Sequence, residues 1–185
     1  MEKTRCGWVP AGDKRYADYH DNEWGKPVFD DHVLFEFLVL ESFQAGLSWN
    51  TILKKRENFR LAFDGFNYEK IAKYDDKKIA ELIQNEGIIR HRRKIEATIN
   101  NAQRFMEIQQ EFGSFSAFLW RYTDNLPIKN EWKTLAEVPA KTPLSDQISK
   151  DLKKRGFKFL GSTTMYAYMQ AVGLVNDHLQ DCFCG

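Results

Sequence analysis

The sequence predicts an all-α protein, and three observations lead to this expectation. Apolar residues recur every three to four positions along most of the 185 residues, and no long stretch alternates as a strand does. Residues that start and stop helices stand between these periodic segments. The length and the 43% hydrophobic content suit one compact domain over residues 1–185 with a sizeable core.

Cap and breaker residues divide the chain into helices. Asp30 or Asp31 is placed to cap an apolar helix that Gly46 can end. Residues 123–143 are the most loop-like stretch, and Thr142-Pro143 then resembles a cap with proline in the first turn. The expected helices cover residues 31–45, 48–63, 90–111, 114–122, 145–154 and 162–172, with shorter helices that begin at Asn67 and Asp75.

The segment 145–173 combines two helices with a short hairpin that glycines bound. Backbone N–H groups of such a hairpin, together with the N-terminus of the second helix, can bind an anion such as a DNA phosphate. Many helical hairpins are only packing units, so this segment alone does not decide between the two roles.

The formal net charge is +1, which excludes strong overall steering toward an acidic partner. Basic residues instead gather in three clusters, Lys54–Arg56, Arg90–Lys94 and Lys153–Arg155. Each cluster alone is more typical of a solvated helix face, whereas three in one chain of this size favour a polyanionic partner.

Cysteine and histidine residues near both ends of the chain suggest a metal site. Cys6 and His20 lie near one end, and His178 and Cys182 lie near the other with helical spacing. Two cysteines and two histidines form a standard closed set for one structural zinc ion. Cys184 is an alternative to Cys182, and buried thiols with ordinary histidines are the alternative to a metal. His-Glu-x-x-His is absent, which argues against hydrolytic zinc.

Glu41 falls on the apolar face of the first long helix. A buried carboxylate costs several kcal/mol unless it is paired. It therefore either pairs with a helical arginine or lysine or binds a ligand. Trp49 follows closely, and Tyr19 and Trp8 adjoin candidate metal ligands, so the group suits a flat cation, although such aromatics also fill cores. The shared face comprises Leu34, Phe37, Leu38, Glu41 and Ala45.

An ordered set of short motifs resembles a known family. The motifs are Cys6–Trp8, Tyr19–Gly25, Gln44–Trp49, Gly87–His91, Leu152–Phe159 and Gly173–His178. Together they are similar to those of bacterial 3-methyladenine DNA glycosylase I, a helix-hairpin-helix glycosylase family. Each motif is short, but their order over nearly the whole chain makes the resemblance specific.

The resemblance implies a helix-hairpin-helix glycosylase fold whose two ends are joined by a structural zinc ion. It assigns Cys6, His20, His178 and Cys182 to zinc, and Glu41, Tyr19 and Trp49, with Trp8 nearby, to base binding and excision. It also assigns Gly46, Leu47, Lys158, Gly161 and Ser162 to DNA binding. The implied partner is alkylated double-stranded DNA, bound by a monomer that needs no protein partner.

The expected reaction is hydrolysis of the N-glycosidic bond of 3-methyladenine, with 3-methylguanine left open, after extrusion of the base. Two alternatives remain: a zinc-stabilised DNA-binding module without catalysis, and a zinc hydrolase. Other glycosylases of the superfamily that the chain resembles use an aspartate after the hairpin to aid the sugar cation or to activate water, and Asp177 lies in roughly that region. Because Asp177 adjoins His178, a role in supporting this metal ligand or the structure is favoured. No apolar run is long enough for a membrane, no signal-peptide pattern is present, and the three cysteines suggest reduced thiols. A cytoplasmic protein is therefore expected.

Overall fold

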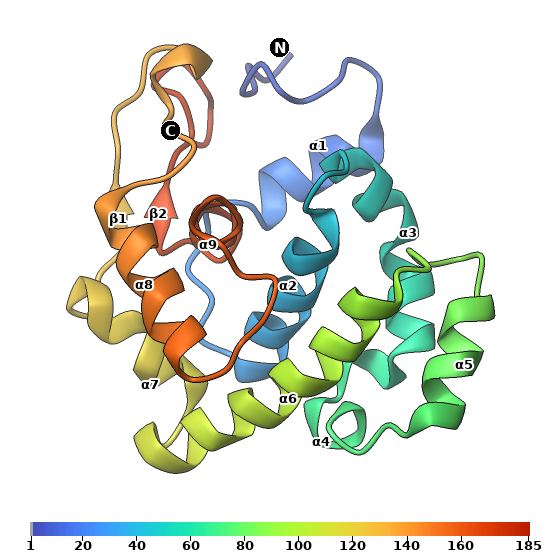
Figure 1. Cartoon of the computed structure of the whole chain (residues 1–185). Helices are drawn as coiled ribbons and strands as arrows, with labels where there is room; N and C mark the ends of the chain where they lie inside the picture. The colour runs from blue at the N-terminus through green and yellow to red at the C-terminus, as the bar shows by residue number, and fades with distance from the viewer. Residues whose placement is uncertain (1) are drawn as a thin grey trace.

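A computed structural model describes residues 2–185 as a mostly helical chain (Figure 1). The helices are α1 (Lys14–Asn22), α2 (Asp31–Gln44), α3 (Trp49–Ala62), α4 (Tyr68–Ile71), α5 (Asp76–Gln84), α6 (Arg92–Phe112), α7 (Phe115–Trp120), α8 (Pro143–Lys154) and α9 (Ser162–Ala171). Three short 3₁₀ helices, η1 (Asp64–Phe66), η2 (Arg121–Thr123) and η3 (Leu135–Glu137), and two strands, β1 (Ile128–Lys129) and β2 (Val175–Asn176), complete the described elements.

Helix α2 runs through the middle of the molecule, and α3, α6, α7 and α9 pack around it (Figure 1). Every residue from Leu34 to Phe43 is buried. The predicted apolar face is therefore only part of a helix that is buried on all sides. Of the two candidate caps, Asp30 accepts a hydrogen bond from the Val33 N–H at 3.1 Å. Asp31 instead accepts the N–H groups of Phe115 and Ser116 and so fixes the start of α7.

The predicted helices are confirmed to within about two residues at their ends. Ser48 caps α3 by accepting the Thr51 N–H, and Thr142 caps α8 with Pro143 in the first turn. His91 caps α6 because its Nδ1 accepts the Lys94 N–H at 3.2 Å.

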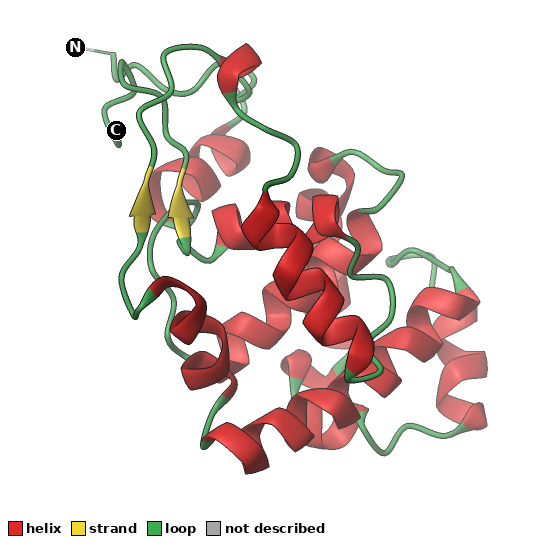
Figure 2. Ribbon diagram, turned by 60° about the vertical axis from the view of Figure 1, so that its left-hand side comes forward, coloured by secondary structure: helices red, strands yellow, loops and turns green. Residues whose placement is uncertain are grey.

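Helix α1 and the two paired strands were not predicted from the sequence. Helix α1 begins after Asp13, whose side chain accepts the Tyr16 N–H at 3.1 Å. Strands β1 and β2 pair in parallel, with Ile128 opposite Val175 (Figure 2). Strands of two residues are too short to produce a visible alternation of polar and apolar positions.

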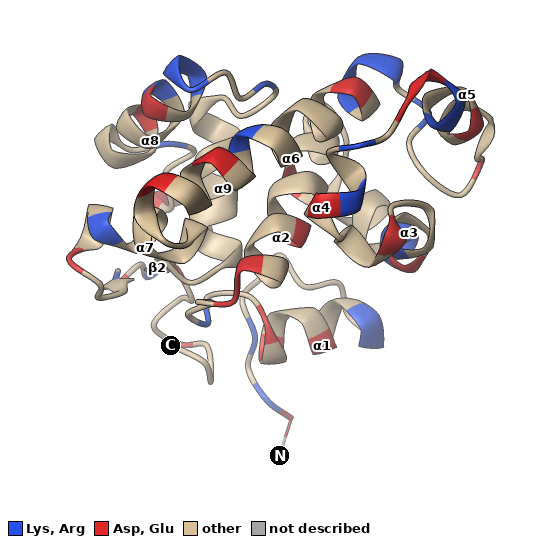
Figure 3. Ribbon diagram, turned by 90° about the horizontal axis from the view of Figure 1, so that it is seen from below, with Lys and Arg blue, Asp and Glu red and all other residues tan. Residues whose placement is uncertain are grey.

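The two ends of the chain lie at the same end of the molecule (Figures 1 and 2). The Phe183 N–H donates to the Thr4 carbonyl at 2.9 Å, and one buried apolar cluster extends in sequence from Cys6 to Cys182. Acidic and basic positions are interspersed over the helices, in keeping with the near-zero net charge (Figure 3). Among residues 2–185, no helix is both long and apolar enough to cross a membrane.

Candidate functional site

The four residues predicted to bind a base line one cavity. Its volume is about 260 Å³, and Trp8, Tyr19, Glu41 and Trp49 all contribute to its wall. These four come from successive segments of the chain, namely the N-terminal segment, α1, α2 and the start of α3. The remaining lining residues are Tyr16, Trp24, Gln44, Leu135, Val138, Ala167, Gln170 and Asp177. A cavity with a largely aromatic wall and few polar groups is typical of a small-molecule site.

Glu41 is buried in this wall without a charged partner. Its side chain is 4% exposed, and burial raises its pKa from 4.5 to about 8. Among residues 2–185, no hydrogen bond or ion pair reaches its carboxylate. Glu36 on the same helix shows the contrast, since it pairs with Arg56 and Arg60. The simpler expectation for Glu41, pairing with a helical arginine or lysine, is therefore not met.

Aromatic rings surround the carboxylate. The rings of Tyr19 and Trp49 are 5.3 Å apart, and those of Trp8 and Trp24 are 4.9 Å apart. Burial raises the Tyr19 pKa well above its ordinary value, so its hydroxyl stays protonated. The buried indole Nε1 of Trp49 has no acceptor among the described residues. Electron-rich ring faces beside an unpaired carboxylate favour a flat cation.

Asp177 lines the same cavity but is fully occupied with hydrogen bonds. Its carboxylate accepts from Asn130 Nδ2 at 2.7 Å, Trp132 Nε1 at 2.9 Å, Gln170 Nε2 at 2.9 Å and the Tyr166 hydroxyl. These donors tie α9 to the segment that follows β1. The carboxylate makes no hydrogen bond to the neighbouring His178 ring, so its structural role is to join these segments and not to orient that histidine.

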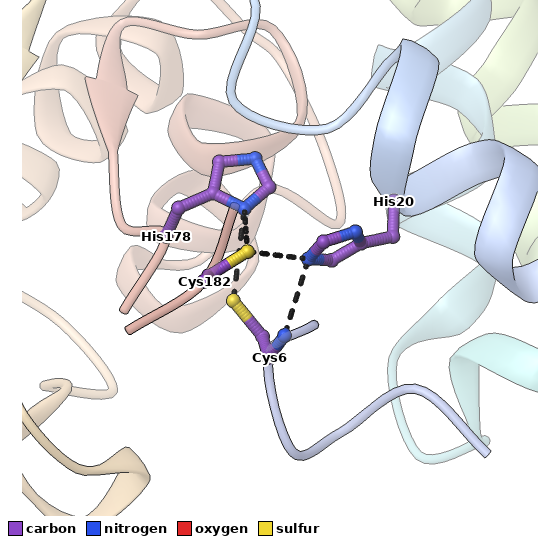
Figure 4. A group of neighbouring side chains, drawn as sticks. All are labelled: Cys6, His20, His178 and Cys182. Carbon is purple, nitrogen blue, oxygen red and sulfur yellow. Dashed lines mark hydrogen bonds between the residues drawn. The ribbon is translucent and has the colours of Figure 1, made fainter. Parts of the chain in front are cut away.

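The four predicted metal ligands meet in one buried group (Figure 4). The ligand atoms of Cys6, His20, His178 and Cys182 all lie within 4.8 Å of one another. Three sulfur–nitrogen distances are 3.5–3.6 Å. Zn–S bonds of about 2.3 Å and Zn–N bonds of about 2.0–2.1 Å at tetrahedral angles place sulfur and nitrogen about 3.6 Å apart. The donor set and its spacing therefore fit a four-coordinate metal ion.

The other ring nitrogens are oriented as in metal sites. His20 Nδ1 lies 2.8 Å from the Asp21 carboxylate, which Arg5 holds with two hydrogen bonds of 2.8 Å. His178 Nε2 lies 2.8 Å from the Trp24 carbonyl. A metal-binding histidine usually donates its second N–H to such an acceptor, which directs the free nitrogen lone pair at the metal. Burial lowers the pKa of both imidazoles and so favours their neutral, ligating form.

Both thiols also receive backbone N–H groups. The Leu179 N–H points to Cys6 Sγ and the Cys184 N–H points to Cys182 Sγ, each at 3.4 Å. Cys184 is only half-buried. It forms a second possible ligand group with His20 and Asp21, but the Asp21 carboxylate already pairs with Arg5. The structure therefore favours Cys182 over Cys184 as the fourth ligand.

One of the predicted DNA-binding residues, Gly46, borders a second hollow. Gly46, which has a φ of +80°, lines a groove of about 450 Å³ together with Thr163 and Thr164 near the start of α9. Gln44, Ala167 and Gln170 line both this groove and the first cavity, so the two adjoin. Leu47 follows Gly46 and is 38% exposed.

The hairpin between α8 and α9 is held on α6. Buried Asn101 accepts the Lys158 N–H and donates to the Lys158 carbonyl, both at 2.9 Å, which leaves the Lys158 side chain exposed. Gly161 is exposed and precedes the first residue of α9. The Ser162 hydroxyl donates a hydrogen bond to the Asp146 carboxylate, so a phosphate at this position would be bound by the Ser162 backbone N–H.

The sequence of the chain matches that of a known protein family. The methyladenine glycosylase family matches the chain over residues 8–185. The chain belongs to this family. A DNA-3-methyladenine glycosylase of Haemophilus influenzae is 52% identical over 181 residues, which cover 98% of this chain and 97% of the relative.

Solved structures of the family share the fold. A crystal structure of 3-methyladenine DNA glycosylase I has a TM-score of 0.95 and 50% identity, covering 98% of this chain and 99% of the other. A variant of 3-methyladenine DNA glycosylase I in complex with 3-methyladenine has a TM-score of 0.91 and 42% identity, with 94% and 93% covered.

Some residues that line the cavity were not singled out from the sequence. Tyr16, Trp24, Gln44 and Gln170 stand in or beside the quoted motifs but carried no assigned role. Tyr16 lies three residues before Tyr19, on the same face of a helix, so recognition of α1 could have found it.

Proposed function

We propose that this protein excises 3-methyladenine from alkylated double-stranded DNA by hydrolysis of the N-glycosidic bond, as a step of base-excision repair. The observation that carries the proposal is the unpaired, buried Glu41 in an aromatic cavity. A non-catalytic groove reader would need polar side chains at its surface instead, and the relatives are named for this reaction.

The chemistry of the lesion matches this cavity. Methylation at N3 makes adenine a cation that leaves its sugar as a neutral base, so the reaction needs no strong general acid. We infer that Glu41 accepts hydrogen bonds from the purine edge and that Tyr19 and Trp49 present aromatic rings to the base. Stacking with cation–π contact contributes up to about 2 kcal/mol when the ring is desolvated. The cation also lowers the pKa of Glu41 and favours its ionised form.

We assign the nucleophile to water. None of the described residues that line the cavity is a lysine. A covalent Schiff-base intermediate is therefore not expected, and neither is a strand-cleaving step. The protein has to extrude the nucleotide, hold the base and stabilise a sugar that gains positive charge.

For DNA binding we assign a helix-hairpin-helix role to residues 145–173. The exposed Lys158 side chain and the N–H groups around Gly161 and Ser162 would contact phosphates. Gly46 and Leu47 would fill the space that the extruded base leaves. The groove beside Gly46 adjoins the base cavity, which supports this path for the nucleotide.

For the metal we propose one structural zinc ion held by Cys6, His20, His178 and Cys182. Zinc would supply cross-linking of the two chain ends and no chemistry at the sugar, since four protein ligands leave no open position. We further propose that residues 1–185 act as a single domain and a monomer without a protein partner, in the cytoplasm, where thiols remain reduced.

The test is to incubate the purified protein with alkylated duplex DNA and identify the released bases by chromatography. Free 3-methyladenine with an intact sugar–phosphate strand supports the proposal. DNA binding without base release would favour a DNA-binding module. Activity that a chelator abolishes while the protein stays folded would favour a zinc hydrolase. Glu41→Gln should lose excision and keep its affinity for undamaged DNA.

A further inference from the structure

Lys94 is a buried lysine that neither the base cavity nor the metal cluster uses. It is 7% exposed and lies in the first turn of α6. A cation at the N-terminus of a helix is unfavourable, because the helix dipole is positive there. Its position therefore needs a partner outside its own helix.

That partner is the C-terminus of α2. The ammonium donates to the carbonyls of Phe43 and Ala45, both at 2.8 Å. Helix α2 ends at Gln44 and has no basic residue in its last turn. The C-terminus of α2 therefore receives its positive charge and its hydrogen-bond donors from Lys94, which belongs to another helix.

The segment that Lys94 holds leads from Glu41 to Trp49 through Gly46 and Leu47. Two further hydrogen bonds brace it: the Leu47 N–H donates to the Gln44 carbonyl at 2.7 Å, and Gln44 Nε2 donates to the Leu47 carbonyl at 2.8 Å. The loop is therefore preformed, with Leu47 directed to the surface beside the groove.

We propose that Lys94 is a positioning residue for base extrusion: its contacts with Phe43 and Ala45 set the loop 45–48 so that Leu47 enters the duplex. This inference rests on the proposed function. Lys94 does not line the base cavity, so its effect should fall on extrusion from the duplex and spare binding of the free base.

The experiment compares Lys94→Met with Lys70→Met, a matched control that removes one exposed positive charge from α4. Two quantities are measured: the single-turnover release of 3-methyladenine from duplex DNA, and the affinity for free 3-methyladenine by tryptophan fluorescence. We expect Lys94→Met to release base about tenfold to a hundredfold more slowly, the range for a displaced group. Free-base affinity should stay within about twofold, and Lys70→Met should match the wild type in both.

A double-mutant cycle with Leu47→Ala separates positioning from general stability. If Lys94 acts through the loop, the double variant is no slower than the slower single variant, whereas independent effects multiply. Three results would each overturn the inference. They are a release rate of Lys94→Met equal to that of the wild type, a loss of free-base affinity as large as the loss of release rate, and a double variant whose rate loss is the product of the two single losses. If Lys94→Met does not fold, Lys94→Gln, which keeps an uncharged NH2 donor group on a shorter side chain, replaces it in every measurement. A wild-type protein that releases no base would refute the proposed function itself.

Discussion

The buried carboxylate of Glu41 should make the stability of the free protein depend on pH. Its pKa is about 8 in the folded protein and 4.5 ordinarily, a difference that corresponds to about 5 kcal/mol. Because the folded pKa is raised, this contribution is fully favourable below pH 4.5 and is lost as the pH rises through 8. Glutamine does not titrate, so Glu41→Gln should remove the dependence.

Urea unfolding of both proteins from pH 4.5 to 9 measures this effect. As the pH rises, the free energy of unfolding of Glu41→Gln should increase relative to that of the wild type by up to about 5 kcal/mol. This value is an upper limit, because water that enters the cavity solvates the carboxylate. The same variant should lose base excision, so stability and activity change in opposite directions. Parallel stability curves would refute the argument that Glu41 is buried without a partner.

Glu36→Gln is the matched control on the same helix. Glu36 is also buried but pairs with Arg56 and Arg60, and each arginine keeps a second carboxylate partner, Glu23 or Glu57, when Glu36 is replaced. Loss of the Glu36 ion pairs should destabilise the protein near neutral pH, by less than the roughly 3–5 kcal/mol that a fully unpaired buried charge costs. Stabilisation by both substitutions would show that the pH effect does not come from the missing partner of Glu41.

Three other changes test the remaining assignments. Cys6→Ser should reduce bound zinc below one per chain and lower the melting temperature by about 10 °C, corresponding to a loss of several kcal/mol; unchanged zinc would remove Cys6 from the ligand set. Lys158→Ala should lower the slope of log affinity against log salt concentration by about one if its ammonium contacts a phosphate, and an equal slope would exclude that contact. The kcat/KM of the wild type should rise about tenfold per pH unit up to the Glu41 pKa of about 8 and then level off, because ionised Glu41 is needed for a cationic base; a flat profile below pH 8 would contradict this.

Sequence patterns predicted most helices because their caps act locally. Ser48, Thr142 and Asp30 each bond to a backbone N–H three residues ahead, and such a signal can be read from neighbouring residues alone. Residue types likewise led to the four candidate metal ligands. The structure adds their mutual distances and burial, which favour Cys182 over Cys184.

Other features depend on distant neighbours and were not visible in the sequence. Three basic clusters were interpreted as surface charge, yet Arg56 is mostly buried between Glu23 and Glu36, and Arg155 pairs with Glu111. Lys94 stands in a basic run but points into the core toward α2. Such inward cations are recognised only when the packing of the helices is known.

The candidate metal ligands and the candidate base cavity share the same short segments. Trp8 stands two positions after Cys6 in the sequence, and Tyr19 stands directly before His20. His178 similarly adjoins Asp177 in the wall of the cavity, while the Trp24 carbonyl contacts the His178 ring. Fixing the ligands therefore also fixes the backbone from which the cavity residues project. A structural metal ion placed here would serve excision by holding the aromatic rings in position around Glu41, without taking part in the reaction at the sugar.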